Sequence, residues 1–146
     1  MNILLTGSDG FIGTHLSKHL KKLKHKVTEI DIKSGNDLMN CPLDYKVDLV
    51  IHLAGLSGVR KSLDTPTEYW KQNVICGQRL FETFKDAKIV YASSSTAAEP
   101  WRNPYAMSKY SLEQIAEPYN SLGLRFTTVY GKGAPKGMLI PKILRN

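Results

Sequence analysis

Short apolar runs alternate with amphipathic stretches along the chain. The run Asn2–Thr6 stops at a glycine, which is typical of a buried strand, and Phe11–Leu23 then repeats its apolar residues at helical spacing. The same alternation continues through the rest of the sequence. We predict further strands over Lys26–Ile32, Asp48–Leu53, Lys88–Ala92 and Leu124–Tyr130, and further helices over Thr65–Phe84, Pro104–Tyr119 and the final stretch Ile140–Asn146.

Strands that alternate with helices predict an α/β fold, in which a parallel sheet is covered by helices on both faces. The stretch from Asp31 to Asp48 is too short for a helix, a strand and a second helix, so we expect the sheet to be shortened after its second strand. Any strand near Asp37 and Leu38 must be brief. Residues 1–146 are therefore predicted to form one domain, with little or no second domain at the C-terminal end.

The composition is typical of a globular protein in a reducing compartment. Of the 146 residues, 42% are hydrophobic and 23% are charged. The two cysteines, Cys41 and Cys76, form no CxxC pair, and no His or Cys spacing suits a metal ion, so we expect neither a disulfide framework nor a metal site. No apolar run is long enough for a signal peptide or a membrane span, which predicts a cytoplasmic protein without a membrane partner.

The net charge of +7 comes largely from one stretch, Lys18–Lys26. A positive balance can indicate nucleic acid or an anionic small substrate as a partner. A solvated helix face is the simpler interpretation, and no nucleic-acid-binding motif accompanies the charge. We therefore expect no nucleic-acid partner.

Three glycines follow the first predicted strand and open the first helix. Gly7, Gly10 and Gly13 have no Cβ, so the backbone of such a turn can approach a pyrophosphate, and the helix N-terminus offers N–H groups to that anion. Asp31, at the end of the second strand, can accept hydrogen bonds from ribose hydroxyls and would repel a 2′-phosphate. Lys33 lies close by with the opposite charge. The pattern predicts a dinucleotide site that prefers NAD to NADP; the alternative is a purely structural glycine turn.

A tyrosine and a lysine are spaced to share one face of the helix predicted from Pro104. Asn103 is a good N-cap and Pro104 a good first residue, so Tyr105 falls in the first turn and Lys109 lies one turn later. A phenol is a poor base at neutral pH, but an ammonium, a helix N-terminus and a positively charged nicotinamide ring all stabilise the phenolate. The same lysine can bond the nicotinamide ribose. A surface pair is the alternative interpretation.

Hydroxyl groups gather at the end of the strand Lys88–Ala92. The stretch Ala92–Thr96 contains three consecutive serines, and α/β sheets place their ligands at the carboxyl ends of strands. Hydroxyls there can bond a substrate hydroxyl beside the tyrosine, although a serine-rich turn alone would have the same sequence.

The motifs together resemble one enzyme family. The sequence is similar to the extended short-chain dehydrogenases/reductases, in the NAD-dependent epimerase/dehydratase group that includes the UDP-glucose 4-epimerases. The resemblance rests on TGSDGFIG (6–13), Asp31, Asp37-Leu38, VIHLAGLSGVRKSLDTPTEYWKQNV (50–74), ASSS (92–95), YAMSK (105–109) and RFTTVYG (125–131). These segments cover nearly the whole chain, and they imply a Rossmann-type doubly wound sheet that binds NAD.

The resemblance also implies roles for individual residues. It assigns catalysis to Ser94, Tyr105 and Lys109, with the tyrosine as the base. The implied cofactor contacts are Gly7, Gly10, Phe11, Ile12 and Gly13 at the pyrophosphate, Asp31 at the ribose, Asp37 and Leu38 beside the adenine, Leu53, Ala54, Gly55, Ser57 and Asn73 along the cofactor, and Tyr105 and Lys109 at its redox end.

The family's chemistry implies a UDP- or dTDP-linked sugar as substrate. Tyrosine removes a proton from a sugar hydroxyl while hydride passes to NAD, and an epimerase returns the hydride to the other face. Dehydratases usually carry Asp-Glu after the catalytic hydroxyl residue, where this chain has Ser95 and Thr96, so a dehydratase is disfavoured. Thr128 replaces an asparagine that commonly touches the sugar nucleotide, and the interval from Ser94 to Tyr105 is shorter than usual.

The leading hypothesis is thus an NAD-dependent nucleotide-sugar epimerase-like enzyme. One alternative is a nucleotide-keto-sugar reductase of the same family, which exchanges its cofactor freely. Another is a non-catalytic NAD-binding module that lacks the substrate region. The family also implies a homodimer through the helices Thr65–Phe84 and Pro104–Tyr119. His52 is predicted to be a core residue, and Tyr69 and Trp70 are predicted to have packing roles on the long helix.

Overall fold

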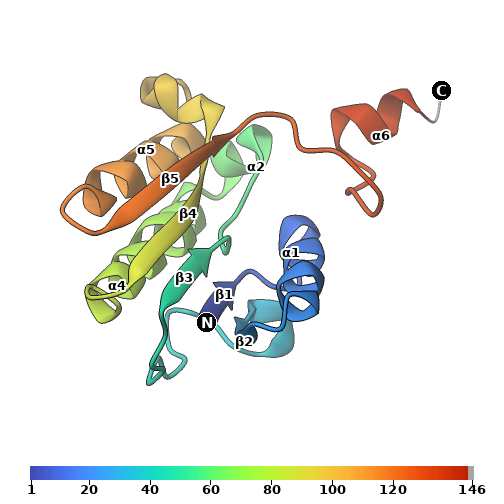
Figure 1. The fold of residues 1–146 in the computed structure, drawn as a ribbon. Helices are drawn as coiled ribbons and strands as arrows, with labels where there is room; N and C mark the ends of the chain where they lie inside the picture. The colour runs from blue at the N-terminus through green and yellow to red at the C-terminus, as the bar shows by residue number, and fades with distance from the viewer. Residues whose placement is uncertain (145–146) are drawn as a thin grey trace.

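The computed structural model describes residues 1–144 and shows one parallel sheet (Figure 1). Within these residues the sheet has five strands in the order β2-β1-β3-β4-β5. The strands are β1 (Asn2–Thr6), β2 (Lys26–Ile30), β3 (Leu49–His52), β4 (Lys88–Ser94) and β5 (Ser121–Phe126). This is the doubly wound Rossmann order without its outermost strand beyond β2, which confirms the predicted fold class.

Helices cover both faces of the sheet. The helices of residues 1–144 are α1 (Phe11–Lys22), α2 (Val59–Asp64), α3 (Pro66–Trp70), α4 (Cys76–Thr83), α5 (Pro104–Ala116) and α6 (Leu139–Ile143). Figure 1 shows α1 on one side of the sheet and α4 and α5 on the other. The alternation of β1 divides the core accordingly: Leu4 packs in the cluster under α4 and α5, whereas Ile3 and Leu5 pack with Leu20 of α1.

The long helix predicted over Thr65–Phe84 consists of α3, a π-helical turn at Lys71–Ile75 and α4. Pro66 occupies the first turn as expected. The helix α2 before it was not predicted. The last strand begins and ends earlier than its predicted range, because β5 pairs Ser121 with Ile89 and ends at Phe126, after which the chain leaves the sheet.

The connection from β2 to β3 contains only a 3₁₀ turn (Ile32–Ser34) before an irregular segment. The brief strand considered near Leu38 does not form. Instead, Leu38, Cys41 and Leu43 are buried in the core on the α4 side. Arg79 of α4 donates hydrogen bonds to the carbonyls of Leu38 and Cys41, the latter at 2.9 Å. The arginine side chain thus bonds backbone carbonyls of this segment, which forms no strand.

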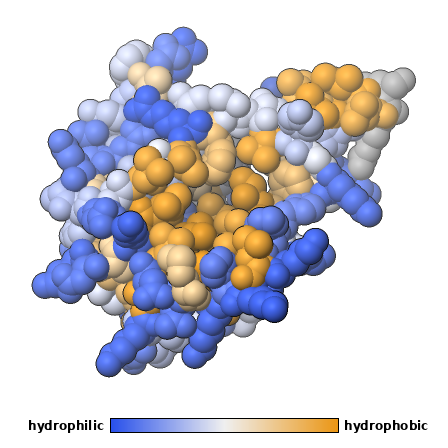
Figure 2. Space-filling view, in the orientation of Figure 1, coloured by the Kyte–Doolittle hydropathy of each residue, from blue (hydrophilic) through white to orange (hydrophobic). Residues whose placement is uncertain are grey.

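The α1 face of the sheet is only partly covered. Figure 2 shows apolar side chains gathered over the middle of this face, with polar side chains around them. A hollow of about 650 Å³ lies here between α1 and the strands β4 and β5, lined by Leu16, Val90, Leu124 and Phe126 among others. Within residues 1–144, every helix is too short or too polar to cross a lipid bilayer.

Candidate cofactor and active site

The strand order places a topological switch point between β1 and β3. From β1 the chain winds outward to β2, and from β3 it winds the other way to β4 and β5. Ligands of open α/β sheets bind outside the carboxyl ends of the strands at such a point. Two cavities of about 440 and 480 Å³ lie there and share Gly7, Gly10, Leu53 and Gly55 in their linings. They form one groove across the strand ends.

The glycine turn forms the middle of this groove. Gly7 has a φ of 73°, a conformation that glycine adopts without strain, and its N–H donates to the carbonyl of Ile30 at 2.8 Å. A Cβ on Gly13 would lie 2.0 Å from the Gly7 carbonyl oxygen, so only glycine lets α1 approach β1 this closely. Gly10 is the N-cap of α1 and has no side chain to bond the first-turn N–H groups. Those groups are therefore free to bond an anion.

The cavity on the β2 side is lined by Asp31 and is called the Asp31 cavity below. The Asp31 side chain is 7% exposed, and its two oxygens accept hydrogen bonds from the backbone N–H groups of Asp9 and Lys33, both at 2.9 Å. Leu38 lines this cavity, as does Ala54. Asp37 does not line it, and its carboxylate accepts a hydrogen bond from Met39 at 2.9 Å. Of the residue pair predicted beside the adenine, only Leu38 faces this space.

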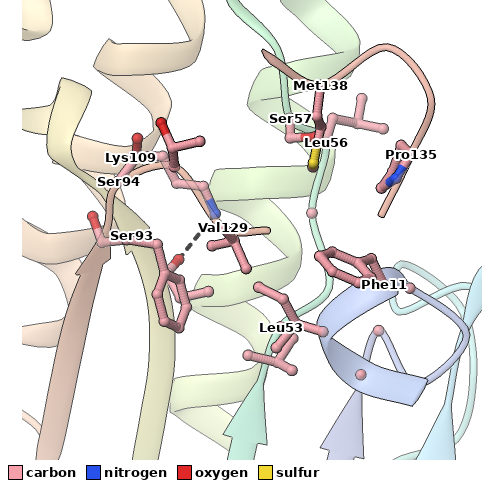
Figure 3. Close-up of a pocket in the computed structure, with 18 of the residues that line it drawn as sticks. Phe11, Leu53, Leu56, Ser57, Ser93, Ser94, Lys109, Val129, Pro135 and Met138 are labelled. Carbon is pink, nitrogen blue, oxygen red and sulfur yellow. Dashed lines mark hydrogen bonds between the residues drawn. The ribbon is translucent and has the colours of Figure 1, made fainter. Parts of the chain in front are cut away.

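The other cavity contains the predicted catalytic residues and is called the serine–lysine cavity. Its lining includes Ser94, Tyr105 and Lys109, together with Phe11, Ile12, Gly13 and Ser57. Figure 3 shows Ser94 and Lys109 across the cavity from Phe11 and Leu53. The local reason is the predicted one: Asn103 caps α5 by accepting from the N–H of Ala106 at 2.9 Å, which sets Tyr105 in the first turn.

Lys109 is the buried cation of this cavity. Its side chain is 6% exposed, and its ammonium donates a hydrogen bond to the carbonyl of Ala92 at 2.9 Å (Figure 3). Burial in surroundings of low polarity disfavours the charged form, which lowers the pKa of Lys109 to about 8. The ammonium is thus held at the end of β4, next to the serines.

Two of the serines differ in what their hydroxyl groups bond. Ser93 donates its proton to the Glu113 carboxylate at 2.5 Å. Glu113 is also held by Arg125 of β5, whose hydrogen bond to it lowers the pKa of the carboxyl group. Ser94 instead accepts hydrogen bonds from the backbone and the hydroxyl of Thr96, at 3.3 and 2.9 Å. Among the contacts of residues 1–144, the proton of Ser94 therefore stays available to the cavity.

Asn73 lies behind the groove and not in its lining. The π-helical turn directs this residue inward, where it is 1% exposed. Its amide bonds both the N–H and the carbonyl of Leu56, at 2.7 and 3.0 Å, and the hydroxyl of Ser108 at 2.9 Å. Asn73 therefore fixes the loop after β3, which supplies Leu53, Gly55 and Ser57 to the serine–lysine cavity. Its direct contact with a cofactor stays a prediction.

Some features of the site were not predicted. Tyr69 is buried as expected, but its hydroxyl also donates to the carbonyl of Ser57 at 2.7 Å, and its ring meets that of Tyr105 edge-on with centroids 6.1 Å apart. Trp70 is 44% exposed, so it packs only in part within this chain. Pro135 and Met138, which follow β5, line one side of the serine–lysine cavity. The sequence signal for this segment is the pair Gly131 and Gly133, which indicates a loop but no site residue.

His52 is an interior residue, as predicted. It is 1% exposed and lies 2.7 Å from the Thr6 hydroxyl through Nδ1. Burial, and secondarily the charge of Lys109, lower its pKa to about 3, so the imidazole is neutral at physiological pH. It supports the end of β3 without facing either cavity of the groove.

Comparisons with known proteins agree with this geometry. A sequence model of the NAD dependent epimerase/dehydratase family matches residues 3–146. The uncharacterized protein MJ1055 of Methanocaldococcus jannaschii is 34% identical over 99% of this chain and 61% of its own length. A UDP-glucose 4-epimerase of Yersinia enterocolitica is 29% identical over 82% of this chain and 49% of its own length. The solved structure of MoeE5 in complex with UDP-glucose and NAD superimposes with a TM-score of 0.88 and 30% identity, over 99% of this chain and 60% of that one.

The strand order and the helices define a Rossmann-type domain with a groove at its switch point. The chain belongs to the NAD dependent epimerase/dehydratase family, which confirms the resemblance seen in the sequence. It spans 61% of the archaeal relative's length. The alignment with that relative runs over 200 positions although this chain has 146 residues, so the relative carries insertions where this chain is short.

Proposed function

We propose that residues 1–146 form the NAD-binding domain of a nucleotide-sugar epimerase-like enzyme. One observation carries the proposal: the cavity that holds Ser94, Tyr105 and Lys109 continues into the glycine turn at the switch point. A dinucleotide laid along this groove reaches from Asp31 to the tyrosine. The NAD bound by MoeE5, and the UDP-glucose in the same complex, support this class of ligands.

The residues present fit NAD along the whole groove. The free N–H groups at the start of α1, beside Phe11 and Ile12, suit the pyrophosphate. The Asp31 carboxylate suits the ribose hydroxyls, and the apolar Leu38 forms a wall for the adenine. Asp37 precedes Leu38 in the chain and does not line this cavity. Tyr105 and Lys109 lie at the redox end, and Asn73 acts through the loop that it fixes.

The proposed chemistry divides between the cofactor and the chain. When bound, NAD supplies the acceptor for a hydride from the sugar carbon. Tyr105 takes the proton of the sugar hydroxyl at its phenol oxygen and later returns it. The Lys109 ammonium stabilises the phenolate, and Ser94 holds the reacting hydroxyl with its free proton. The apolar walls, Leu53 and Met138 among them, keep water from the reacting atoms.

A Tyr105→Phe variant tests the proposal. We expect turnover of UDP- or dTDP-sugars to fall by roughly 10²- to 10⁴-fold, because the proton acceptor is lost, while the Kd for NAD⁺ changes less than about threefold. Tyr110→Phe, on the same helix but outside both cavities of the groove, is the matched control and is expected to retain activity. The measurements are NADH absorbance with a panel of these sugars, product analysis, and calorimetric titration with NAD⁺.

The outcomes separate the three hypotheses. Tightly retained NAD with interconversion of sugars supports the epimerase, whereas release of oxidised or reduced cofactor in each cycle indicates a reductase. NAD⁺ binding with no turnover of any sugar in the panel would leave a binding module and end the enzymatic proposal for this chain. No binding of NAD⁺ at all would end the whole proposal.

A homodimer through α3 and α5 is part of the proposal. These helices pack against each other. Trp70 at the end of α3 is 44% exposed, Ile75 in the π-helical turn 38%, and Met107 of α5 40%. Large apolar side chains at such exposure indicate an interaction surface. We expect Met107→Glu to raise the dimer Kd by about 100-fold or more, because it buries a charge, as measured by light scattering after gel filtration. Leu122→Glu on β5 is the control, and a monomeric wild type would contradict the proposal.

We also place the protein in the cytoplasm. Cys41 and Cys76 are both free and buried, which suits a reducing compartment. Detection of the protein in the periplasmic or extracellular fraction of its host would contradict this placement.

A further inference from the structure

Tyr69 of α3 contacts both the loop after β3 and the first turn of α5. Its side chain is fully buried and lines neither cavity of the groove. Its ring meets the Tyr105 ring edge-on, with centroids 6.1 Å apart. Its hydroxyl donates to the carbonyl of Ser57 at 2.7 Å, and the carbonyl oxygen of Gly58 lies 3.0 Å away. One buried side chain thus touches two parts of the site that are distant in the sequence.

The loop after β3 depends on side-chain hydrogen bonds for its shape. Gly58 has a φ of 103°, and glycine loses more conformational freedom on folding than other residues. Asn73 bonds the N–H and the carbonyl of Leu56, and Tyr69, one turn earlier, supplies the donor for the next two carbonyls. Burial raises the pKa of Tyr69, so its hydroxyl keeps the proton that it donates.

The Tyr105 phenol, by contrast, is oriented by packing. Its ring lies in the first turn of α5, is half-buried and lines the serine–lysine cavity. Among the hydrogen bonds of residues 1–144, none involves the Tyr105 hydroxyl, so the oxygen stays available to a ligand. Edge-to-face contact between aromatic rings is directional, and Tyr69 provides that contact here. The Tyr69 ring therefore limits the directions that the Tyr105 ring can take.

We propose that Tyr69 is a positioning residue whose ring and hydroxyl have separate tasks: the ring sets the direction of the Tyr105 phenol, and the hydroxyl holds the loop along which the cofactor lies. The inference rests on the proposed function, because it requires Tyr105 as the proton acceptor and NAD along the loop. Tyr69 itself touches neither ligand, since it lines neither cavity of the groove.

The two tasks predict different effects of substitution. Removing the hydroxyl keeps the ring pair but loosens the loop, so binding of NAD⁺ weakens while the chemical step is preserved. Removing the ring also frees the phenol, and poorly aligned groups slow the chemical step even when both ligands are saturating. A residue that only supports the fold would lower stability without dividing its effects in this way.

Tyr69→Phe and Tyr69→Leu separate the tasks. We expect Tyr69→Phe to raise the Kd for NAD⁺ about tenfold and to change kcat less than about threefold. Tyr69→Leu is expected to raise this Kd to a similar extent and to lower kcat about 30-fold at saturating ligands. Calorimetric titration of the full chain with NAD⁺ measures the Kd, and turnover of the UDP- or dTDP-sugar that reacts fastest measures kcat.

The ring contact also has a readout that requires neither ligand. In the chain labelled with ¹³C in its tyrosine rings, the NMR signals that disappear in Tyr105→Phe belong to Tyr105. Ring currents of Tyr69 shift these signals. The shift is expected to be retained in Tyr69→Phe and lost in Tyr69→Leu.

Tyr119, just beyond the C-terminal end of α5, offers matched controls. Its ring packs against Phe81 with centroids 5.3 Å apart, and it lines neither cavity of the groove. Tyr119→Phe and Tyr119→Leu are expected to leave kcat, the Kd for NAD⁺ and the Tyr105 signals unchanged, although the leucine variant loses stability.

The task of the ring is overturned if Tyr69→Leu has the same kcat as Tyr69→Phe, or loses no more kcat than Tyr119→Leu does. The task of the hydroxyl is overturned if Tyr69→Phe binds NAD⁺ as tightly as the wild type. If circular dichroism shows that Tyr69→Leu is misfolded, Tyr69→Met fills the space without a ring and is expected to show the same loss of kcat. Unchanged Tyr105 signals in Tyr69→Leu overturn the ring contact even where the wild type binds no NAD⁺, an outcome that by itself ends the proposed function.

Discussion

A Gly13→Ala variant is expected to lose about 3 kcal/mol of folding free energy together with its affinity for NAD⁺. The added Cβ would lie 2.0 Å from the carbonyl oxygen of Gly7 and 2.9 Å from the Cα of Ser8. All of these atoms belong to the backbone, so no side chain can turn away to relieve the overlap. Relief requires α1 to move from the end of β1, and that movement opens the turn on which the pyrophosphate is proposed to lie.

Urea unfolding and NAD⁺ titration measure the two effects of Gly13→Ala. Gly137→Ala is the matched control, because a Cβ there meets no atom within 4 Å and its backbone is not in the left-handed region. It is expected to change both quantities by less than about 0.5 kcal/mol, the size seen for most surface substitutions. If Gly13→Ala and Gly137→Ala had the same folding free energy and the same Kd for NAD⁺, the close contact between α1 and the end of β1 would be contradicted.

A Lys109→Met variant is expected to gain about 3 kcal/mol of stability at pH 7 and to lose turnover. Burial lowers the pKa of Lys109 to about 8 from an ordinary value of 10.5, so charging this group in the folded protein costs free energy at about 1.4 kcal/mol for each pKa unit. Methionine has nearly the same shape and carries no charge. The ammonium is therefore expected to weaken the fold in return for a function in the cavity.

The pH dependence gives the sign of this effect. The folded-state pKa lies below the unfolded one, so the unfolded state binds more protons between about pH 8 and 10.5, and the wild type gains stability as the pH rises through that window. The advantage of Lys109→Met is then full below pH 8 and disappears above about 10.5. Chemical unfolding at pH 7, 8 and 10 measures it, with the exposed Lys85→Met as control. A destabilised variant at pH 7 would contradict the account.

Much of the fold follows from local signals in the sequence. The three glycines after β1 and the N-cap pair Asn103 and Pro104 identify two helix starts, because each position has a local steric or hydrogen-bonding requirement. The position of β5 was less accessible. Its burial pattern has no clear alternation, and the apolar Val129 beyond it lines the cavity instead of joining the sheet. Pairing with β4 determines this strand, and that contact is not local in sequence.

The site was predicted in its parts but not in its connections. The sequence placed a hydroxyl at Ser94 but did not distinguish it from Ser93 by chemistry, since the distinction depends on Glu113, twenty residues away. It marked Asn73 without revealing that a π-helical turn directs the amide to Leu56. Such hydrogen bonds depend on the distance between elements, which periodicity and spacing do not encode.

The irregular connection after β2 bears on how small such a scaffold can become. The strand absent here would lie outside β2, at the periphery of the sheet, whereas the switch point lies between β1 and β3 in its interior. Contraction at the periphery leaves the interior strand ends, and the groove across them, in their usual relation. Engineers who want a miniature dinucleotide-binding module should therefore delete from the outer rim beyond β2, and provide an arginine such as Arg79 to bind the shortened backbone.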